Sequence, residues 1–314
     1  MGVLIMKKIL VTHTGRFHAD EVFATAILSL IYKNNIEIHR VLDSDVKNYV
    51  NNPNAIIYDI GRGEFDHHQH DPNAYRENGI PYAACGLIWK AFYMELLYNL
   101  PDGLRKFTVQ YIDKMLIQGI DDIDNGHFKS NNSYDPMNVT TVIGLFNPPS
   151  LSTPEEQMKQ FKNAVRCAKT ILINLLSKAK ETYNSINAVN KAIDERSDPH
   201  ILILPEYMPW KGTLHANPFA DNIWYVIYPS NRIGYNIEAV PITPNGIDKR
   251  QDVPSSWWGK ENKELAKITG VETAFFCHFS GFLSACKTLD DAIKFARLAV
   301  DEVEKVFLEI GVEL

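Results

Sequence analysis

The sequence predicts an α/β protein whose N-terminal part is built on a parallel sheet. Three short runs rich in apolar residues, 8–12, 36–42 and 55–58, are typical of strands that are buried on both faces. Between the first two, residues 20–33 place apolar side chains at helical spacing. Strand, helix and strand in this order indicate a sheet covered by helices, and ligands of such sheets bind beyond the carboxyl ends of the strands.

Further along, residues 82–99 and 103–119 show the pattern of helices, and residues 126–150 are rich in Asn and Pro, which indicates a long loop. Residues 153–195 contain no Pro or Gly after Pro154 and are expected to be mostly helical. Beyond residue 199 the pattern changes to short strands between turns rich in Pro, Gly and Asn, followed by an amphipathic helix. We expect these strands at 201–204, 224–228, 235–240 and 273–277, and the helix at 290–310.

This division predicts three parts. Residues 1–150 form the parallel-sheet domain, residues 151–198 form a helical linker, and residues 199–314 form a smaller domain of mixed α+β structure.

Composition and charge exclude several classes of protein. The chain has 314 residues, of which 45% are hydrophobic and 22% charged, as expected for a globular protein with a sizeable core. Its net charge of −6 provides no basic tail for nucleic acid. No apolar run is long enough to span a membrane, and no targeting segment is evident, so we expect a cytoplasmic protein. The four Cys are scattered without a CxxC motif, which indicates reduced thiols.

Potential metal ligands are concentrated where two predicted strands end. The stretch from Asp59 to Asp71 holds seven His, Asp or Glu residues within thirteen positions and follows the run at 55–58. A second cluster, His13 to Glu21, follows the run at 8–12. Because both clusters lie at the carboxyl ends of predicted parallel strands, we expect them to converge. His and carboxylate ligands suit Mn²⁺, Zn²⁺ or Fe²⁺, and excess carboxylate favours Mn²⁺ or Mg²⁺.

A third group of acidic residues, Asp121, Asp122 and Asp124, ends a predicted helix, where carboxylates are unfavourable beside the negative end of the dipole unless a cation is near. One could be a ligand while another orients a ligating His. Adjacent residues of an extended segment point in opposite directions, so His67 and His68 divide into a metal ligand and a residue facing the substrate. The alternative for each cluster is a solvated polar turn.

The motifs and their order resemble the DHH phosphoesterase superfamily. Asp59-Ile60-Gly61, Asp66-His67-His68 and His13 with His18-Ala19-Asp20 are similar to its motif series. The segments from Thr12 to Glu21 and from Phe65 to Gln69 resemble more closely the Myg family, of melanocyte-proliferating-gene type. The segments 121–126 and 276–282 also fit that family. The resemblance implies a DHH-type domain, a helical linker and a C-terminal substrate-binding domain, with metal-dependent 3′-to-5′ RNA exonuclease activity.

On this basis the site residues can be assigned. One or two divalent ions, Mn²⁺ in the first place and Mg²⁺ or Zn²⁺ as alternatives, are expected on six ligands, with Asp59 bridging. These ligands are His13, His18, Asp20, Asp59, His67 and Asp121. We expect His68 to contact the scissile phosphate or to protonate the leaving oxygen, and we count it as catalytic together with Asp66 and Asp20. Substrate contacts are expected from Arg16, Arg232, His278 and Lys287.

Three functions remain open. The first is a phosphodiesterase acting on RNA or short oligonucleotides. The second, mildly favoured by the net charge of −6, is a small-molecule phosphatase or pyrophosphatase on the same metal centre. The third is a metal-binding protein without turnover, because His18 stands where the first DHH motif usually has an Asp. A homo-oligomer is compatible with all three.

Overall fold

The computed structural model describes residues 7–33, 35–69, 75–128 and 136–309. His70 and Asp71, the last two residues of the ligand-rich stretch that begins at Asp59, lie outside these ranges, as do the first six residues. The chain divides into two compact units, Met1–Lys180 and Glu181–Leu314, each with a hydrophobic core. No helix within the described ranges is both long enough and apolar enough to cross a membrane.

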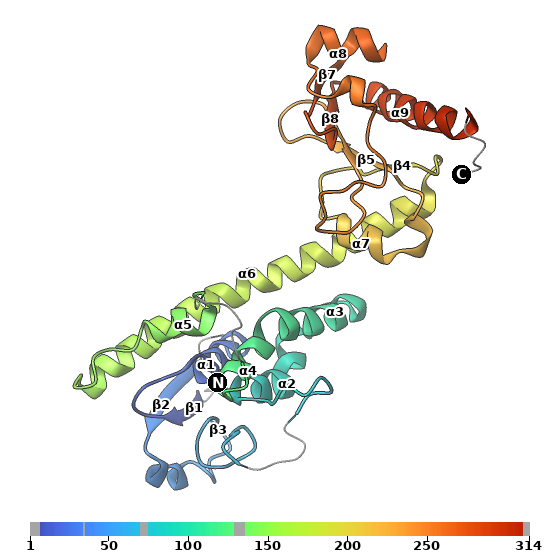
Figure 1. Ribbon diagram of the computed structural model, residues 1–314. Coiled ribbons are helices and arrows are strands. Elements are labelled where there is room, and N and C mark those ends of the chain that lie inside the picture. Colours follow the sequence, from blue (N-terminus) through green and yellow to red (C-terminus); the bar gives the residue numbers. More distant parts are fainter. Residues whose placement is uncertain (1–6, 34, 70–74, 129–135, 310–314) are drawn as a thin grey trace, which may run out of the picture. The chain divides into compact units, whose positions relative to one another are not determined.

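A three-stranded parallel sheet forms the centre of the first unit (Figure 1). Its strands are β1 (Lys8–His13), β2 (Ile36–Val41) and β3 (Ala55–Ile57), in the order β2-β1-β3. His13 pairs with Val41 of β2, and Val11 pairs with Ile57 of β3. The strands therefore all end at the same edge of the sheet, as the sequence predicts.

Helices that surround this sheet bury the apolar side chains of the first unit. In α1 (Ala19–Ile31) every residue from Ala19 to Ser29 is buried, which explains why its apolar pattern is almost continuous. It packs against α2 (Ala84–Leu97). The described elements that complete the unit are a 3₁₀ turn (Asp43–Asn48), α3 (Asp102–Ile112), a π-helical segment (Asp113–Ile117), α4 (Gln118–Asp124) and α5 (Val139–Gly144). Helix α5 lies inside the loop predicted at 126–150.

The helix predicted at 153–195 is a single helix, α6 (Pro154–Glu195), and the boundary between the units falls inside it. Phe161 and Leu172 belong to the core of the first unit, whereas Val189 and Ile193 pack into a core cluster of the second. The predicted linker is therefore part of both cores, because its two ends carry separate apolar faces. The predicted bounds 1–150, 151–198 and 199–314 remain a prediction.

The second unit is built on a mixed five-stranded sheet with the order β4-β5-β6-β8-β7, in which β4 and β5 are parallel and the other pairs antiparallel. Helix α9 (Leu289–Glu309) buries Phe295 and Ala299 against the core that includes this sheet. The strands are β4 (Ile201–Ile203), β5 (Tyr225–Pro229), β6 (Tyr235–Ala239), β7 (Ala274–Cys277) and β8 (Leu283–Cys286). Shorter elements are α7 (Lys211–Ala216), α8 (Asn262–Thr269) and 3₁₀ turns at Pro218–Ala220 and Ser255–Trp257.

Strand β8 and helices α7 and α8 are not among the elements predicted from the sequence. Strand β8 has only four residues and helix α7 only six, too few for a hydrophobic period to be visible. The prediction of a mixed second part is confirmed by the mixed sheet.

Candidate metal centre

The carboxyl ends of β1 and β3 bring the first two candidate ligands together. His13 is the last residue of β1, and Asp59 follows β3 by two residues. His13 Nε2 lies 3.2 Å from Asp59 Oδ2. Asp59 has a backbone φ of +57°, a conformation rare for residues other than Gly but more common for Asp, and it lies at a turn where such strain often marks function. Two predicted clusters thus converge where parallel strands place them.

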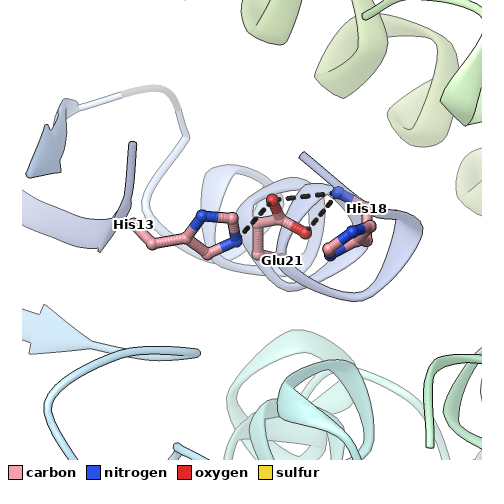
Figure 2. A group of neighbouring side chains, drawn as sticks. All are labelled: His13, His18 and Glu21. Atoms are coloured by element: carbon pink, nitrogen blue, oxygen red, sulfur yellow. Dashed lines mark hydrogen bonds and ion pairs between the residues drawn. The ribbon is translucent and has the colours of Figure 1, made fainter. Parts of the chain in front are cut away.

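The first turn of α1 supplies two buried acids. Asp20 and Glu21 are fully buried. The carboxylate of Glu21 lies between His13 and His18, as Figure 2 shows: it accepts the backbone N–H of His18 at 2.9 and 3.0 Å and lies 3.1 Å from His13 Nε2. Glu21, which stands directly after Asp20, is not among the ligands predicted from the sequence. A Glu three residues after a helix start usually serves as a cap, and here it also contacts a candidate ligand.

The loop that carries His13 and His18 is fixed by two distant residues. Arg40 of β2 donates to the carbonyl oxygens of His13 (3.1 Å) and Gly15 (2.8 Å). Asn147 forms a second clamp, because it accepts the N–H of Phe17 at 2.9 Å and donates to its carbonyl at 2.7 Å. The Arg40 guanidinium also lies over the rings of Phe17 and Phe161. The positions of the two histidines therefore depend on contacts outside the loop.

His67 faces three carboxylates. Its Nε2 lies 3.2 Å from Asp59 Oδ1, 3.2 Å from Asp124 Oδ2 and 4.0 Å from Asp20 Oδ2. Its other ring nitrogen lies 3.3 Å from Asn125 Oδ1, which orients the ring as outer contacts orient metal-ligating His. Asp59 thus stands between His13 on one oxygen and His67 on the other, the position expected of a bridging carboxylate.

The donor set fits a divalent cation. Four overlapping groups of side chains each bring their ligand atoms within 4.8 Å of one another. Several of these atoms are buried without a hydrogen-bond partner, namely both Asp20 oxygens, Asp59 Oδ1 and His67 Nε2. Buried carboxylates that lack such partners are costly, and a cation would satisfy them together. The residues of the four groups are His13, His18, Asp20, Glu21, Asp59, His67, His68 and Asp124.

Charge pairing shifts the pKa values in this cluster strongly. Burial opposes protonation of His13, but Asp59 and Glu21 outweigh it and raise its pKa to about 10. Burial likewise opposes protonation of His67, but Asp59 and Asp124 raise its pKa to about 9. Burial acts against the charged form of Asp59, yet His13 and His67 lower its pKa to about 2. For Asp20, burial and the neighbouring carboxylates Asp59 and Glu21 raise the pKa well above its usual value. Charge coupling of this strength within one cluster is typical of a functional site.

Asp66 and His68 form the rim of the cluster. Asp66 is buried and accepts the backbone N–H of Arg62 at 2.6 Å, while its other oxygen lies 2.8 Å from His68 Nδ1. The His68 side chain is 61% exposed, whereas that of His67 is 8% exposed. Both line a cavity of about 850 Å³ together with His13, His18 and Asp124. His67 is therefore the buried and His68 the exposed member of the pair, but their side chains do not diverge as the alternation predicted: the ring centroids lie 4.2 Å apart, and both rings belong to one group of candidate ligands with Asp59.

Asp121 is not brought together with the other predicted ligands. Its Oδ2 lies 2.7 Å from Arg76 Nη2, and its Oδ1 accepts the N–H of Gly86 at 3.0 Å. Burial raises the pKa of Asp121 to about 7, against the opposing effect of Arg76. Asp124, one turn further along α4, is the acid that reaches His67. Two carboxylates three residues apart share one side of a helix, so the sequence alone could not separate them.

The predicted substrate contacts are divided between the units. Arg16 is exposed in the loop beside His18, in the first unit. The second unit contains the other three. Arg232 lines a cavity of about 580 Å³ with Phe275 and Phe276. His278 Nδ1 lies 2.9 Å from Ser280 Oγ. Lys287 is exposed and donates its backbone N–H to Thr273 O at 3.1 Å.

Known proteins resemble the chain over nearly its full length. The MYG1 protein of Dictyostelium discoideum is 26% identical, with 95% of this chain and 98% of that protein covered. The MYG1 protein C694.04c of Schizosaccharomyces pombe is 25% identical, with 92% and 96% covered. The human MYG1 exonuclease is 26% identical, with 91% and 84% covered.

A solved structure, that of the pGpG-specific phosphodiesterase PggH from Vibrio cholerae, aligns with this chain at 14% sequence identity and a TM-score of 0.31. The alignment covers 96% of this chain and 99% of the PggH chain. Residues 9–300 match the family described as MYG1_exonuc, Uncharacterised protein family (UPF0160). This match covers most of the chain and confirms the resemblance seen in its motifs, so the chain belongs to the MYG1_exonuc family.

Proposed function

We propose that this chain is a metal-dependent phosphodiesterase that removes nucleotides from the 3′ ends of RNA. A hydrolase of phosphodiester bonds is supported by membership in the MYG1_exonuc family and by relatives named MYG1 exonuclease. The observation that carries the metal dependence is the convergence of four carboxylates and four imidazoles at the end of a parallel sheet. These are Asp20, Glu21, Asp59, Asp124, His13, His18, His67 and His68.

The chemistry of this donor set favours Mn²⁺. Four carboxylates and four imidazoles make up the ligand groups, and a mixed set of oxygen and nitrogen ligands with a large share of carboxylate and no thiolate suits Mn²⁺ better than the softer metals. A divalent ion bound there would polarise the phosphoryl oxygens and make a water molecule nucleophilic at neutral pH. Asp59, held between His13 and His67, would contribute to ligation on both sides.

The chain's own residues then have separate tasks. Asp66 holds His68 through Nδ1, and the exposed His68 side chain lines the cavity. From there a protonated His68 donates a hydrogen bond to a phosphate oxygen or a proton to the leaving oxygen. Asp124, Asp59 and Asp20 keep His67 in place beside them. Arg40 and Asn147 fix the loop that carries His13 and His18.

An assay with 3′-end-labelled RNA and Mn²⁺ tests the proposal. Wild type is expected to release labelled mononucleotide, whereas Asp59→Asn and His67→Ala are expected to be inactive. Asp43→Asn serves as the matched control, because Asp43 lines the same cavity but belongs to none of the ligand groups. Cleavage by Asp59→Asn at the wild-type rate would contradict the proposal.

A small-molecule phosphatase or pyrophosphatase is the second candidate, since the site cavity of about 850 Å³ would also admit a nucleotide. Relative rates on pyrophosphate, a dinucleotide and longer RNA distinguish the two. Hydrolysis of pyrophosphate in preference to any RNA would favour the second candidate.

A further inference from the structure

A basic groove runs beside the first half of α6 in the first unit. It has a volume of about 1200 Å³ and lies between this helix and the first residues of β2, Ile36–Ile38. Within the described three-stranded sheet β2 is an edge strand that pairs only with β1. The cationic residues of the groove are Lys7, Lys159, Lys162, Arg166 and Lys169.

The charge of the groove is opposite to that of the chain. Five cations line it against two carboxylates, Glu37 and Glu155, while the whole chain has 32 Lys and Arg against 38 Asp and Glu. The four cations on α6 follow the spacing i, i+3, i+7 and i+10 and therefore share one helix face. With a rise of about 1.5 Å per residue they extend over about 15 Å. Such a stripe is complementary to a polymer with evenly spaced negative charges.

Lys162 and Arg166 are the groove cations best placed to contact a ligand, because both are exposed. Lys159 lies 3.5 Å from Glu156, and both side chains are well exposed, so this pair is worth little. Among the described residues, Lys162 has no ion-pair partner and is exposed. Arg166 hydrogen-bonds the neutral amide of Asn163 and so keeps its charge uncompensated. The groove thus offers cationic groups that the fold itself does not neutralise.

The groove is also distant from the metal centre. It lies where β1 and β2 begin, at Lys7 and Ile36, whereas His13 lies where β1 ends. The five residue steps from Lys8 to His13 separate the Lys7 end of the groove from His13 by about 17 Å. The α6 side of the groove lies nearer, because Phe161 packs on Phe17 of the loop that carries His13 and His18. A dinucleotide in the metal site would not be expected to extend along the groove, but a longer strand could occupy both.

We propose that this groove binds the phosphate backbone of single-stranded nucleic acid at a distance from the scissile bond. The inference rests on the proposed function, because it specifies the substrate as a polynucleotide rather than a small phosphate ester. Contacts to phosphates alone carry no sequence information, so binding is expected to be independent of base sequence and to weaken with salt.

Binding of a fluorescent oligoribonucleotide, measured with EDTA present to prevent cleavage, tests the groove without requiring activity. The variant Lys162→Gln/Arg166→Gln removes two groove cations. Lys106→Gln/Lys114→Gln is the matched control, because it makes the same change in net charge at exposed positions of the same unit outside the groove. All four side chains are exposed, so both variants are expected to fold.

The slope of log K against log[salt] is the diagnostic quantity. Each phosphate contact to a single strand contributes about 0.7 to it, so the groove variant is expected to lose about 1.4 of slope and the control none. Affinity for a dinucleotide is expected to stay unchanged in both. Equal slopes for wild type and the groove variant would overturn the proposal. The groove would then have another ligand, for example a peptide that pairs with the edge strand β2. Failure of the proposed function would be distinguishable, because the groove would still bind RNA in this assay while the assay with Mn²⁺ would show no hydrolysis.

Discussion

The carboxylate of Asp66 holds His68 at two points. Its Oδ1 accepts the backbone N–H of His68 at 3.0 Å and lies 2.8 Å from the ring Nδ1. This double contact fixes both the backbone and the ring of a residue that is otherwise mostly exposed. A cavity-lining side chain with one ring nitrogen held in this way is arranged to act on a ligand.

The variant His68→Gln is therefore expected to lose turnover but keep its metal. A general acid typically contributes about 10²–10⁴-fold to the rate, and kcat should fall within that range. Metal content per chain, measured by elemental analysis, should match wild type, because Asp66 engages His68 Nδ1 at 2.8 Å and the seven other residues of the ligand groups remain. Reduced metal content in His68→Gln would identify His68 as a ligand instead.

Removal of the metal should leave protons in its place, which makes metal affinity depend on pH. His13 and His67, whose pKa values are raised to about 10 and about 9 by neighbouring carboxylates, must lose their protons to bind an ion. Metal affinity is therefore expected to increase with pH across the neutral range, by about tenfold per pH unit for each proton released. Calorimetric titrations in buffers of different ionisation enthalpy count these protons, and a heat that is independent of the buffer would contradict the prediction.

Whereas metal affinity should increase with pH, the stability of the metal-free protein should decrease. In the folded protein the pKa values of His13 and His67 lie above the usual 6.5. The two residues therefore make their full contribution to the free energy of unfolding below about pH 6.5, and this contribution is lost as the pH rises through about 9 and 10. Thermal unfolding in EDTA is expected to show a falling Tm between pH 7 and 10. The double variant His13→Gln/His67→Gln should have a smaller decrease over the same range, and an identical decrease would assign the effect to other groups.

Arg40 is expected to act on metal affinity without touching the ions. It donates to the carbonyl oxygens of His13 and Gly15 through a planar fork, which Lys cannot reproduce. Arg40→Lys should weaken metal binding by about 10–100-fold, the usual effect of an outer contact. Arg105→Lys is the control, because Arg105 also donates to a backbone carbonyl, that of Leu100, but far from the ligands in sequence. Equal metal affinity in both variants would show that the loop holds its position without Arg40.

The sequence was most informative where local pattern and topology agree. Apolar runs placed β1 and β3, and parallel pairing then implied that His13 and Asp59 meet, as they do at 3.2 Å. The part played by Glu21 was not predictable, because a Glu in the first helical turn is explained equally well by capping. The alternation of side chains predicted that His67 and His68 diverge, but their ring centroids lie 4.2 Å apart, and the contact of the His68 ring with Asp66 could not be predicted without the geometry of the turn.

The sequence alone could not predict which acid of α4 belongs to the metal centre. Asp121 and Asp124 share a side of the helix, and only packing decides which of them reaches His67. Arg76, which lies over the ring of Tyr82, forms an ion pair with Asp121. Gly86 leaves room for that carboxylate, because a Cβ on Gly86 would lie 1.9 Å from Asp121 Oδ2. Contacts between residues so distant in sequence cannot be read from spacing.

The two acids should therefore respond differently to the same substitution. Asp124→Asn is expected to lower metal content and abolish activity with little change in Tm, because Asp124 faces His67 in the cavity. Asp121→Asn is expected to keep the metal but to destabilise the fold by about 1–3 kcal/mol, since a buried charged hydrogen bond is lost. The loss should not exceed this range because Arg76 retains Asp113 at 2.8 Å. Denaturant unfolding together with elemental analysis separates the two effects. Loss of metal from Asp121→Asn at unchanged stability would restore Asp121 as a ligand and show that the ion draws it away from Arg76.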